Sequence, residues 1–263
     1  MPFNHDNGIR YYTFGIFPRE VTHAVFTRQG GVSPEPWASL NVGGTVGDEV
    51  TRVRENRYRS FAALGRRIES LFDVWQVHSA DAVCADAPRD PGEELTQADI
   101  IFTDRPSVTL YMRFADCVPI LLHDPKQGVV GLAHAGWLGT VRGTTSAAVR
   151  TMCEHYGTRP ENILAAIGPS IGVDHYEVGH DVIAKVHESF NSDAERLLQT
   201  RGGKTYFDLW AANATQLQQS GVDKIEIAGL CTACHLDDWF SHRAEKGRTG
   251  RFGALIGLRT QDQ

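Results

Sequence analysis

Residues 115–137 read ADCVPILLHDPKQGVVGLAHAGW, two apolar runs separated by a short polar turn. The runs at residues 118–123 and 129–134 are short and bounded by Asp, Pro or Gly, which is typical of β-strands. Cys117 stands just before the first run and His134 closes the second. The stretch therefore predicts two strands and places two metal-ligating side chain types at their ends.

The same criteria predict further strands at residues 21–26, 72–77, 108–113, 163–167, 224–228 and 254–258. Helical spacing of apolar residues predicts helices at 48–64, 138–156, 182–190 and 209–219, the first with Asp48 as its N-cap. Because strands and helices interleave along the chain, we expect a mixed α/β (α+β) fold with helices packed around a central mixed sheet. We expect one domain, residues 21–263, preceded by an N-terminal extension at residues 1–20.

The chain carries 26 Lys and Arg against 32 Asp and Glu, a formal net charge of -6 at pH 7. Nucleic-acid binding depends on clustered basic residues, so this balance argues against a nucleic-acid partner. No apolar run reaches the length of a signal peptide or a membrane span, and five cysteines are an odd number that indicates reduced thiols. We therefore expect a cytoplasmic protein that contacts no membrane.

Three short motifs carry possible metal ligands: Trp-Gln-Val-His ending at His78, Ala-Asp-Cys-Val-Pro around Cys117, and His-Ala-Gly-Trp beginning at His134. Two imidazoles and one thiolate suit a borderline ion such as Zn²⁺, and a free fourth position would make the site catalytic. The long spacings between the three residues match no compact metal motif. On spacing alone, the zinc site is one hypothesis among several.

A second hypothesis pairs Cys117 with His134 as nucleophile and base, because a thiolate beside an imidazole attacks amide or ester carbonyls. Asp116 would then orient His134 or merely begin the strand. A third hypothesis makes Cys117 a small buried hydrophobic residue.

Residues 231–235 read CTACH, which matches the pattern of covalent haem attachment. Such attachment normally requires export, so we do not expect haem in a protein without a signal peptide. A second zinc site or a redox pair remains open, although a single Cys-X-X-Cys lacks the second pair that a structural zinc site prefers. Cys234 and His235 receive no role from the sequence.

The chain resembles the YfiH family, also called the laccase-domain or polyphenol-oxidase-like family. The resemblance is carried by the three motifs above together with TRQGGVS at residues 27–33, SLNVG at 39–43, VGD at 46–48, GPSI at 168–171, FSHR at 240–243 and TGR at 249–251. It extends from about residue 20 to the end of the chain. It implies a single α/β domain, similar to the Cys/His deamidase domain of cytotoxic necrotising toxins, with zinc bound by His78, Cys117 and His134, which are also the expected catalytic residues.

The resemblance further implies phosphorolysis of adenosine, inosine, guanosine and methylthioadenosine, with adenosine deaminase activity. Purine nucleosides and phosphate are then the expected partners, bound by a monomer or small homo-oligomer. Phosphate needs donors near the metal, for which we select Arg28 beside two glycines and, second, Arg243. Asn41 is expected to hydrogen-bond a base or ribose, or to form an Asx turn.

Three alternatives remain from the residues and the family's older labels. A Cys117/His134 hydrolase or amidase could act on cell-wall precursors, as in peptidoglycan editing. A copper polyphenol oxidase is less well supported, because none of the 11 histidines forms the His-X-His pairs of a multicopper cluster, although Cu²⁺ could bind. Outside enzymology, the chain could be a metal-binding partner protein.

Overall fold

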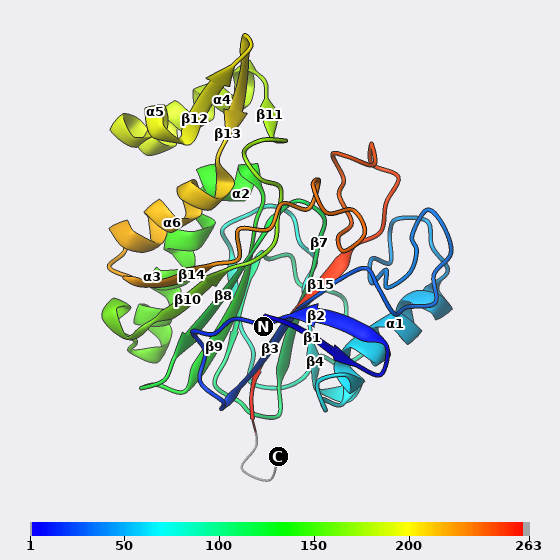
Figure 1. The fold of residues 1–263 in the computed structure, drawn as a ribbon. Helices are drawn as coiled ribbons and strands as arrows, with labels where there is room; N and C mark the ends of the chain where they lie inside the picture. Colours follow the sequence, from blue (N-terminus) through cyan, green and yellow to red (C-terminus); the bar gives the residue numbers. More distant parts are fainter. Residues whose placement is uncertain (1, 260–263) are drawn as a thin grey trace.

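The computed structural model describes residues 2–259, whose strands form two six-stranded sheets and one three-stranded sheet (Figure 1). The mixed α/β class is confirmed, but the strands divide between two large sheets where one central sheet was expected. Residue 1 of the expected N-terminal extension and residues 260–263 of the expected domain lie outside the described part of the chain.

The first sheet is antiparallel except where β4 lies parallel to β7. Its strands, in spatial order, are β1 (Phe3–Asp6), β2 (Ile9–Tyr12), β3 (Val21–Phe26), β15 (Phe252–Leu258), β7 (Thr109–Phe114) and β4 (Leu71–Phe72). The segment before Val21, expected as an N-terminal extension, thus supplies two strands that continue this sheet beyond β3.

The second sheet is mixed, with parallel pairs at both edges. Its strands, in spatial order, are β14 (Lys224–Ile227), β10 (Leu164–Ile167), β8 (Val118–Asp124), β9 (Val129–Ala135), β6 (Ile100–Thr103) and β5 (Ala82–Cys84). The small sheet contains β11 (Glu177–Val178), β13 (Lys204–Phe207) and β12 (Leu198–Arg201). It projects above the two large sheets in Figure 1.

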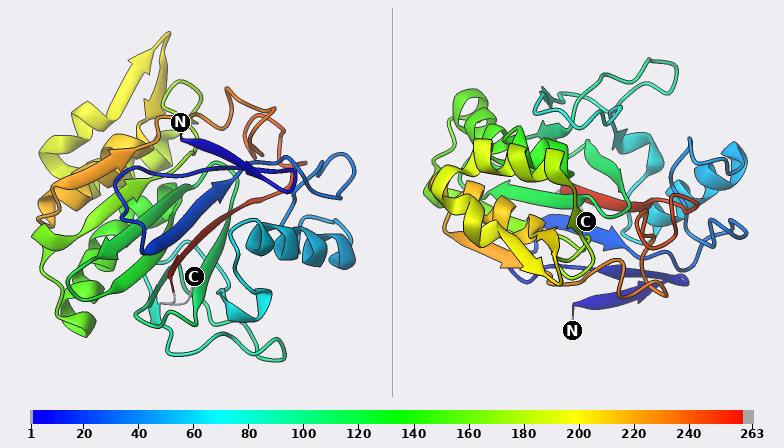
Figure 2. Two further views of the ribbon diagram at one scale, coloured as in Figure 1. Left: turned by 60° about the horizontal axis from the view of Figure 1, so that its bottom comes forward. Right: turned by 90° about the horizontal axis from the view of Figure 1, so that it is seen from above.

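Helices cover the outer faces of the two large sheets, so the layers run helix, sheet, sheet, helix (Figures 1 and 2). The α-helices are α1 (Val50–Ala62), α2 (Trp137–Val141), α3 (Thr144–Tyr156), α4 (His180–Phe190), α5 (Ala194–Leu197) and α6 (Leu209–Gln219). Short 3-10 helices lie at Ile68–Ser70, Pro160–Asn162 and Asn191–Asp193. No described helix is long and apolar enough to cross a bilayer.

The apolar run of strand β8 is continuous because the strand is buried on both faces. Ile120 and Leu122 pack on the side of the sheet that faces α3 and α6, whereas Leu121 joins the apolar cluster between the two large sheets. A strand that is buried on both faces has no polar positions to alternate with its apolar ones. The other face of the first sheet packs against α1, where the rings of Phe61 and Tyr111 lie 5.4 Å apart.

Two of the predicted elements were wrong in extent. The strand expected at residues 72–77 ends at Phe72, because the Asp73 carboxylate turns inward to Arg89 at 2.8 Å and Arg113 at 3.2 Å. The helix expected at residues 138–156 is two helices, separated at Gly143, whose φ of 79° lies in the left-handed region that breaks an α-helix.

The predicted N-cap of α1 was also wrong. Helix α1 begins after Glu49, which makes no side-chain cap hydrogen bond. The Asp48 carboxylate instead accepts hydrogen bonds from Ser33 Oγ at 2.5 Å and Asn41 Nδ2 at 2.9 Å. Asp48 therefore fastens the loop before α1 to the two preceding motifs.

Strand β3 contains a buried histidine whose surroundings favour the neutral ring. The backbone N–H of Phe14 donates to Nε2 of His23 at 2.8 Å, and Nδ1 of His23 lies 3.4 Å from the carbonyl oxygen of Val21. Burial lowers the pKa of His23 from 6.5 to about 4. Protonation of Nε2 would place its N–H next to the N–H of Phe14, which would lose its hydrogen-bond acceptor.

We predict that the free energy of unfolding falls as the pH drops from about 6.5 to about 4. In that window His23 binds more protons in the unfolded state than in the folded state. Its contribution to the free energy of unfolding is therefore fully present above the unfolded pKa and is lost as the pH falls to the folded pKa. A pKa difference of this size corresponds to about 3 kcal/mol by pH 4. Urea unfolding at several pH values measures the change.

The His23→Gln variant removes the ionisable group and should show a weaker pH dependence in that window. His155→Gln, at an exposed position on α3, serves as the matched control and should retain the wild-type slope. An unchanged slope in His23→Gln would contradict the assignment.

Candidate metal centre

The hairpin of β8 and β9 brings two of the three predicted ligands together. The strands pair antiparallel, with Pro119 opposite His134 and Val118 opposite Ala135. Cys117 directly precedes β8, and His134 is the penultimate residue of β9. Both side chains therefore lie at the open end of the hairpin, because this register sets residues 117 and 134 close across the two strands.

The third predicted ligand comes from the loop between β4 and β5. Nε2 of His78 lies 3.9 Å from Sγ of Cys117, and the rings of His78 and His134 are 4.9 Å apart. The ligand atoms of all three residues lie within 4.8 Å of one another. The structure thus places His78, Cys117 and His134 in one cluster.

The backbone at His78 is held in an uncommon conformation. Its φ of 60° lies in the left-handed region, which costs free energy in a residue other than glycine. Nη1 of Arg142 donates to the carbonyl oxygen of His78 at 2.8 Å. The N–H groups of Val77 and Ser79 donate to Oδ2 of Asp99 at 3.0 and 2.7 Å, so the loop is fixed on both sides of the histidine.

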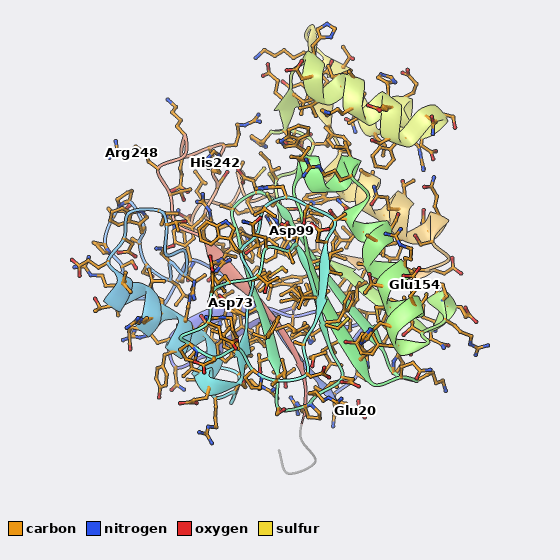
Figure 3. The ribbon with its side chains drawn as sticks, turned by 180° about the vertical axis from the view of Figure 1, so that it is seen from behind. Glu20, Asp73, Asp99, Glu154, His242 and Arg248 are labelled. Atoms are coloured by element: carbon orange, nitrogen blue, oxygen red, sulfur yellow. The ribbon has the colours of Figure 1, made fainter. Side chains whose placement is uncertain are left out.

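Asp99 also orients the second histidine. Its Oδ1 lies 2.7 Å from Nδ1 of His134, which leaves Nε2 of His134 as the ligand atom. Figure 3 shows Asp99 among the strands of the molecule's interior. Orienting His134 was one of two roles considered for Asp116, and Asp116 does not fill it. The Asp116 carboxylate accepts hydrogen bonds from Thr232 Oγ1 at 2.7 Å and from the N–H of Arg243 at 2.6 Å.

Cys117 and His134 favour a thiolate beside an imidazolium when no ion is present. Burial opposes ionisation of Cys117, but the charge of His134 and hydrogen bonds from both histidines lower the pKa of the thiol to about 6. Burial likewise opposes the charged form of His134, but Cys117 and Asp99 raise its pKa to about 9. The thiol is therefore in its ligating form at neutral pH.

The donor set and its surroundings fit a metal ion. Two imidazoles and one thiolate converge, and Asp99 supplies the carboxylate partner that metal-binding histidines usually have. A Cβ at Gly136 would lie 2.8 Å from Sγ of Cys117 and 2.9 Å from Cδ2 of His78. Glycine at position 136 therefore keeps free the space in which the three donors meet.

The cluster lies in a cavity of about 640 Å³. Besides the three donors, it is lined by Gly43, Gly44, Thr45, Arg57, Asp73, Trp75, Gln76, Arg89, Leu95, Arg113, Ala115, Asp116, Trp137, Tyr176, His242, Arg243 and Arg251. Five arginines against two aspartates give the walls a local excess of positive charge in a chain whose net charge is -6. The cavity is therefore suited to an anion.

The arginines are held by structural partners of different kinds. Asp73, which Figure 3 labels, accepts ion pairs from Arg57, Arg89 and Arg113 at 3.5, 2.8 and 3.2 Å. Nη1 of Arg251 donates to the carbonyl oxygen of Gly250 at 2.8 Å. Burial lowers the pKa of Arg251, while the nearby Cys117 and Asp116 raise it, so Arg251 lies within the electric field of the donor cluster.

Of the three predicted substrate-binding residues, only Arg243 lines the cavity. Its guanidinium lies over the ring of Tyr176 at 5.0 Å, and its Nη1 donates to the carbonyl oxygen of Glu177 at 2.8 Å. Arg28 donates instead to the carbonyl oxygen of Ala38 at 2.8 Å and lies over the ring of Phe240 at 4.4 Å. This arrangement gives Arg28 a structural position and does not support its direct contact with phosphate.

Asn41 is fully buried and holds two residues that line the cavity. Its Oδ1 accepts hydrogen bonds from the N–H groups of Gly43 at 3.0 Å and Arg251 at 2.9 Å. The first of these is the Asx turn that was one of the two expectations for Asn41. Asn41 therefore positions Arg251 and does not itself reach the cavity.

Sequence reasoning missed Asp99 and gave Arg251 no individual role. Asp99 precedes the apolar run at residues 100–102 in the same way that Cys117 precedes β8, so the criterion of polar side chains at strand ends would have identified it. Arg251 belongs to the Thr-Gly-Arg motif, which carried no predicted contact. The fact that Asn41 positions this arginine across 210 residues has no local sequence signal.

Comparisons with known proteins agree over nearly the whole chain. A sequence model of the family described as multi-copper polyphenol oxidoreductase laccase matches residues 22–259. A purine nucleoside phosphorylase of Deinococcus radiodurans is 41% identical over 238 residues, covering 90% of this chain and 89% of the relative. The purine nucleoside phosphorylase YlmD of Geobacillus stearothermophilus is 36% identical and covers 89% of both chains.

Solved structures show the same fold. The structure of YlmD from Geobacillus stearothermophilus superposes with a TM-score of 0.92 at 33% identity, covering 98% of this chain and 99% of that one. The hypothetical protein YfiH of Bacillus licheniformis gives a TM-score of 0.91 at 32% identity, with the same coverage.

We predict that Asp99→Asn lowers zinc affinity by about 10- to 100-fold, the usual effect of removing the carboxylate partner of a metal-binding histidine. The amide has only one oxygen for the two sets of donors that Asp99 now satisfies, so either His134 or the loop around His78 loses its partner. Competition with a chromophoric chelator measures the affinity.

Asp81→Asn is the matched control, because Asp81 is an exposed carboxylate of the same loop region. It should bind zinc as the wild type does. Equal affinities for Asp99→Asn and the wild type would show that Asp99 does not position the donors.

Proposed function

We propose that this chain, which belongs to the YfiH family, is a zinc-dependent purine nucleoside phosphorylase. The sequence model of that family is described as multi-copper polyphenol oxidoreductase laccase. The observation that carries the proposal is the combination, in one cavity, of the donor cluster, an excess of arginines and two tryptophans. The relatives named purine nucleoside phosphorylase support the same substrate class.

His78, Cys117 and His134 would hold the metal ion through two nitrogens and one sulfur. When bound, such an ion supplies Lewis-acid activation next to the substrate. We propose zinc because three ligands of this kind with a fourth position free are the usual catalytic zinc pattern. Copper fits the same donors, but the chain has no His-X-His pair from which a multicopper cluster could be assembled.

In phosphorolysis a phosphate oxygen forms a bond to C1′ of the ribose while the bond from C1′ to the purine nitrogen breaks. The purine leaves with a proton, and the products are the free base and ribose 1-phosphate. The protein must hold a doubly charged anion against the sugar, and fixed cationic donors do this at low reorganisation cost. We assign this role to Arg251 and Arg243, replacing the first expectation of Arg28.

Tyr176 supplies a further donor in the same region. Burial, with a smaller effect of the Cys117 charge, raises the pKa of Tyr176 well above its usual range. The phenol therefore keeps its proton at neutral pH and is available to donate a hydrogen bond to the substrate. Arg243, which lies over this ring, fixes its position.

The purine would lie against the tryptophans of the cavity. Trp75 is 44% exposed, an unusual state for so large an apolar side chain, and Trp137 lines the cavity next to His134. Flat aromatic faces stack on any purine and distinguish poorly between adenine, guanine and hypoxanthine. This supports a broad specificity for adenosine, inosine, guanosine and methylthioadenosine. Adenosine deamination in the same site is part of the proposal.

One observation favours a second function for the same residues. Cys117, His134 and Asp99 follow one another as nucleophile, base and orienting carboxylate, with Asp99 2.7 Å from Nδ1 of His134. That order is the one used by cysteine hydrolases. A Cys117/His134 hydrolase or amidase that acts on cell-wall precursors would need the thiolate free of metal.

We predict that the wild-type protein releases adenine from adenosine only when phosphate is present, and that Cys117→Ala reduces the rate by at least about 100-fold, because one of three metal ligands is lost. Chromatographic detection of adenine, inosine and ribose 1-phosphate measures both reactions. Cys153→Ala, at a half-buried thiol on α3, is the matched control and should retain full activity.

Strong chelation followed by zinc return separates the two functions. Phosphorolysis should disappear and return with zinc, whereas a thiol hydrolase would become more active without metal and would form a covalent thioester. If neither adenine nor inosine appears in zinc-loaded protein, the nucleoside reaction is refuted.

For the phosphate site we predict that Arg251→Gln raises the KM for phosphate by about 10- to 100-fold, the usual cost of a lost charge-assisted hydrogen bond, and changes the KM for adenosine much less. Arg54→Gln, at an exposed arginine of α1, should leave both constants unchanged. Equal increases in both KM values would mean that Arg251 shapes the cavity without contacting phosphate.

A further inference from the structure

A second set of metal-ligating side chains lies outside the residues that line the cavity. His175, in the segment between β10 and β11, lies against Cys231 and Cys234 of the loop that follows β14. Their ligand atoms are all within 4.8 Å of one another. His175 is 56 residues from Cys231 in the chain, so only the fold brings the three together.

The distances fit a single ion between the three side chains. Nδ1 of His175 lies 3.7 Å from Sγ of Cys231 and 3.5 Å from Sγ of Cys234. In a tetrahedral zinc site with ordinary bond lengths, nitrogen and sulfur ligands are separated by about 3.5 Å. The donors are therefore already at the spacing that a bound ion requires.

The thiol of Cys231 also has the hydrogen-bond partner expected of a thiolate ligand. The backbone N–H of Gly172 donates to Sγ of Cys231 at 3.2 Å, and this donation stabilises negative charge on sulfur. A Cβ at position 172 would lie 3.1 Å from Cβ of Cys231, so glycine permits the close approach.

We propose that His175, Cys231 and Cys234 bind a second divalent metal ion, for which zinc is the best match, at a site separate from the cavity. Two thiolates and one imidazole are a borderline-soft donor set, which favours zinc over magnesium or calcium. Cys231 is buried, whereas Cys234 and His175 are exposed, so the ion enters from solvent and keeps one position open to it. The inference does not depend on the nucleoside reaction.

This site gives the residues at 231–235 a different role from haem attachment. His235 is not part of the cluster, and its carbonyl oxygen accepts hydrogen bonds from the N–H groups of Asp238 at 3.0 Å and Trp239 at 2.9 Å. The histidine that completes the two-cysteine pair is the distant His175. The local Cys-X-X-Cys thus supplies only two of the three donors.

The ion would join two segments that form part of the cavity wall. Tyr176, which lines the cavity, directly follows His175. Thr232, which donates to the Asp116 carboxylate at 2.7 Å, directly follows Cys231. Asp116 in turn precedes the ligand Cys117. The second ion therefore has a structural role: it fixes the wall behind the first metal centre.

Zinc content after dialysis against a weak chelator tests the proposal. The wild type should retain two zinc ions per chain, Cys234→Ser one and Cys117→Ser one. Cys153→Ser, which changes a thiol outside both clusters, should retain two. Because Cys234 is exposed, its serine variant should fold, which circular dichroism checks.

Cobalt substitution assigns the second ion to its ligands. Cobalt-loaded Cys117→Ser should keep a sulfur-to-cobalt charge-transfer band, and Cys117→Ser/Cys234→Ser should lose most of it. The proposal is overturned if the wild type binds one zinc and Cys117→Ser binds none, or if Cys234→Ser retains two. It is also overturned if Cys231 and Cys234 form a disulfide in zinc-treated protein. None of these experiments measures phosphorolysis, so the second site can be refuted while the nucleoside reaction stands.

Discussion

The register of the β8–β9 hairpin is the constraint on which the candidate metal centre in the cavity depends. With Pro119 opposite His134, Cys117 and His134 share the open end of the hairpin. A slip of one residue would turn every side chain of the strand to the opposite face. Such a slip is strongly opposed here, because β8 is buried on both faces, by helices on one side and by the other large sheet on the other. The packing of the sandwich therefore fixes the distance between two candidate metal ligands.

Asp99 extends this constraint to the third ligand. One carboxylate oxygen holds Nδ1 of His134, and the other accepts two backbone N–H groups beside His78. Burial opposes ionisation of Asp99, but its contacts with His134 and the loop amides lower its pKa. A single buried charge is thus compensated by both ligand-bearing segments. This makes the donor cluster preorganised, since neither histidine has to be ordered by the incoming ion.

Local patterns predicted most strands and helices, because apolar periodicity and Gly or Pro boundaries act over a few residues. With help from the family resemblance, they also selected His78, Cys117 and His134 as candidate ligands, which the fold places in one cluster. They could not separate two sheets from one, because strand order depends on contacts distant in the chain. Nor could they choose between arginines. Arg28 and Arg251 both lie within two residues of a glycine, and only the fold directs Arg28 to Ala38 and Glu245 and places Arg251 at the cavity. The pairing of His175 with a Cys-X-X-Cys has the same cause.

Asp116 explains why the closing segments of the chain are needed by a site formed from its middle. Its φ of 79° is left-handed, a conformation that costs about 1–3 kcal/mol outside glycine and persists only where neighbours enforce it. Here Thr232 and the N–H of Arg243 hold its carboxylate, and its carbonyl oxygen accepts the N–H of Ile171 at 3.0 Å. These three partners come from the segments that carry His175, Cys231 and the Phe-Ser-His-Arg motif. The direction in which Cys117 presents its sulfur is therefore set by residues more than 50 positions away, and anything that fixes those segments also fixes this candidate ligand.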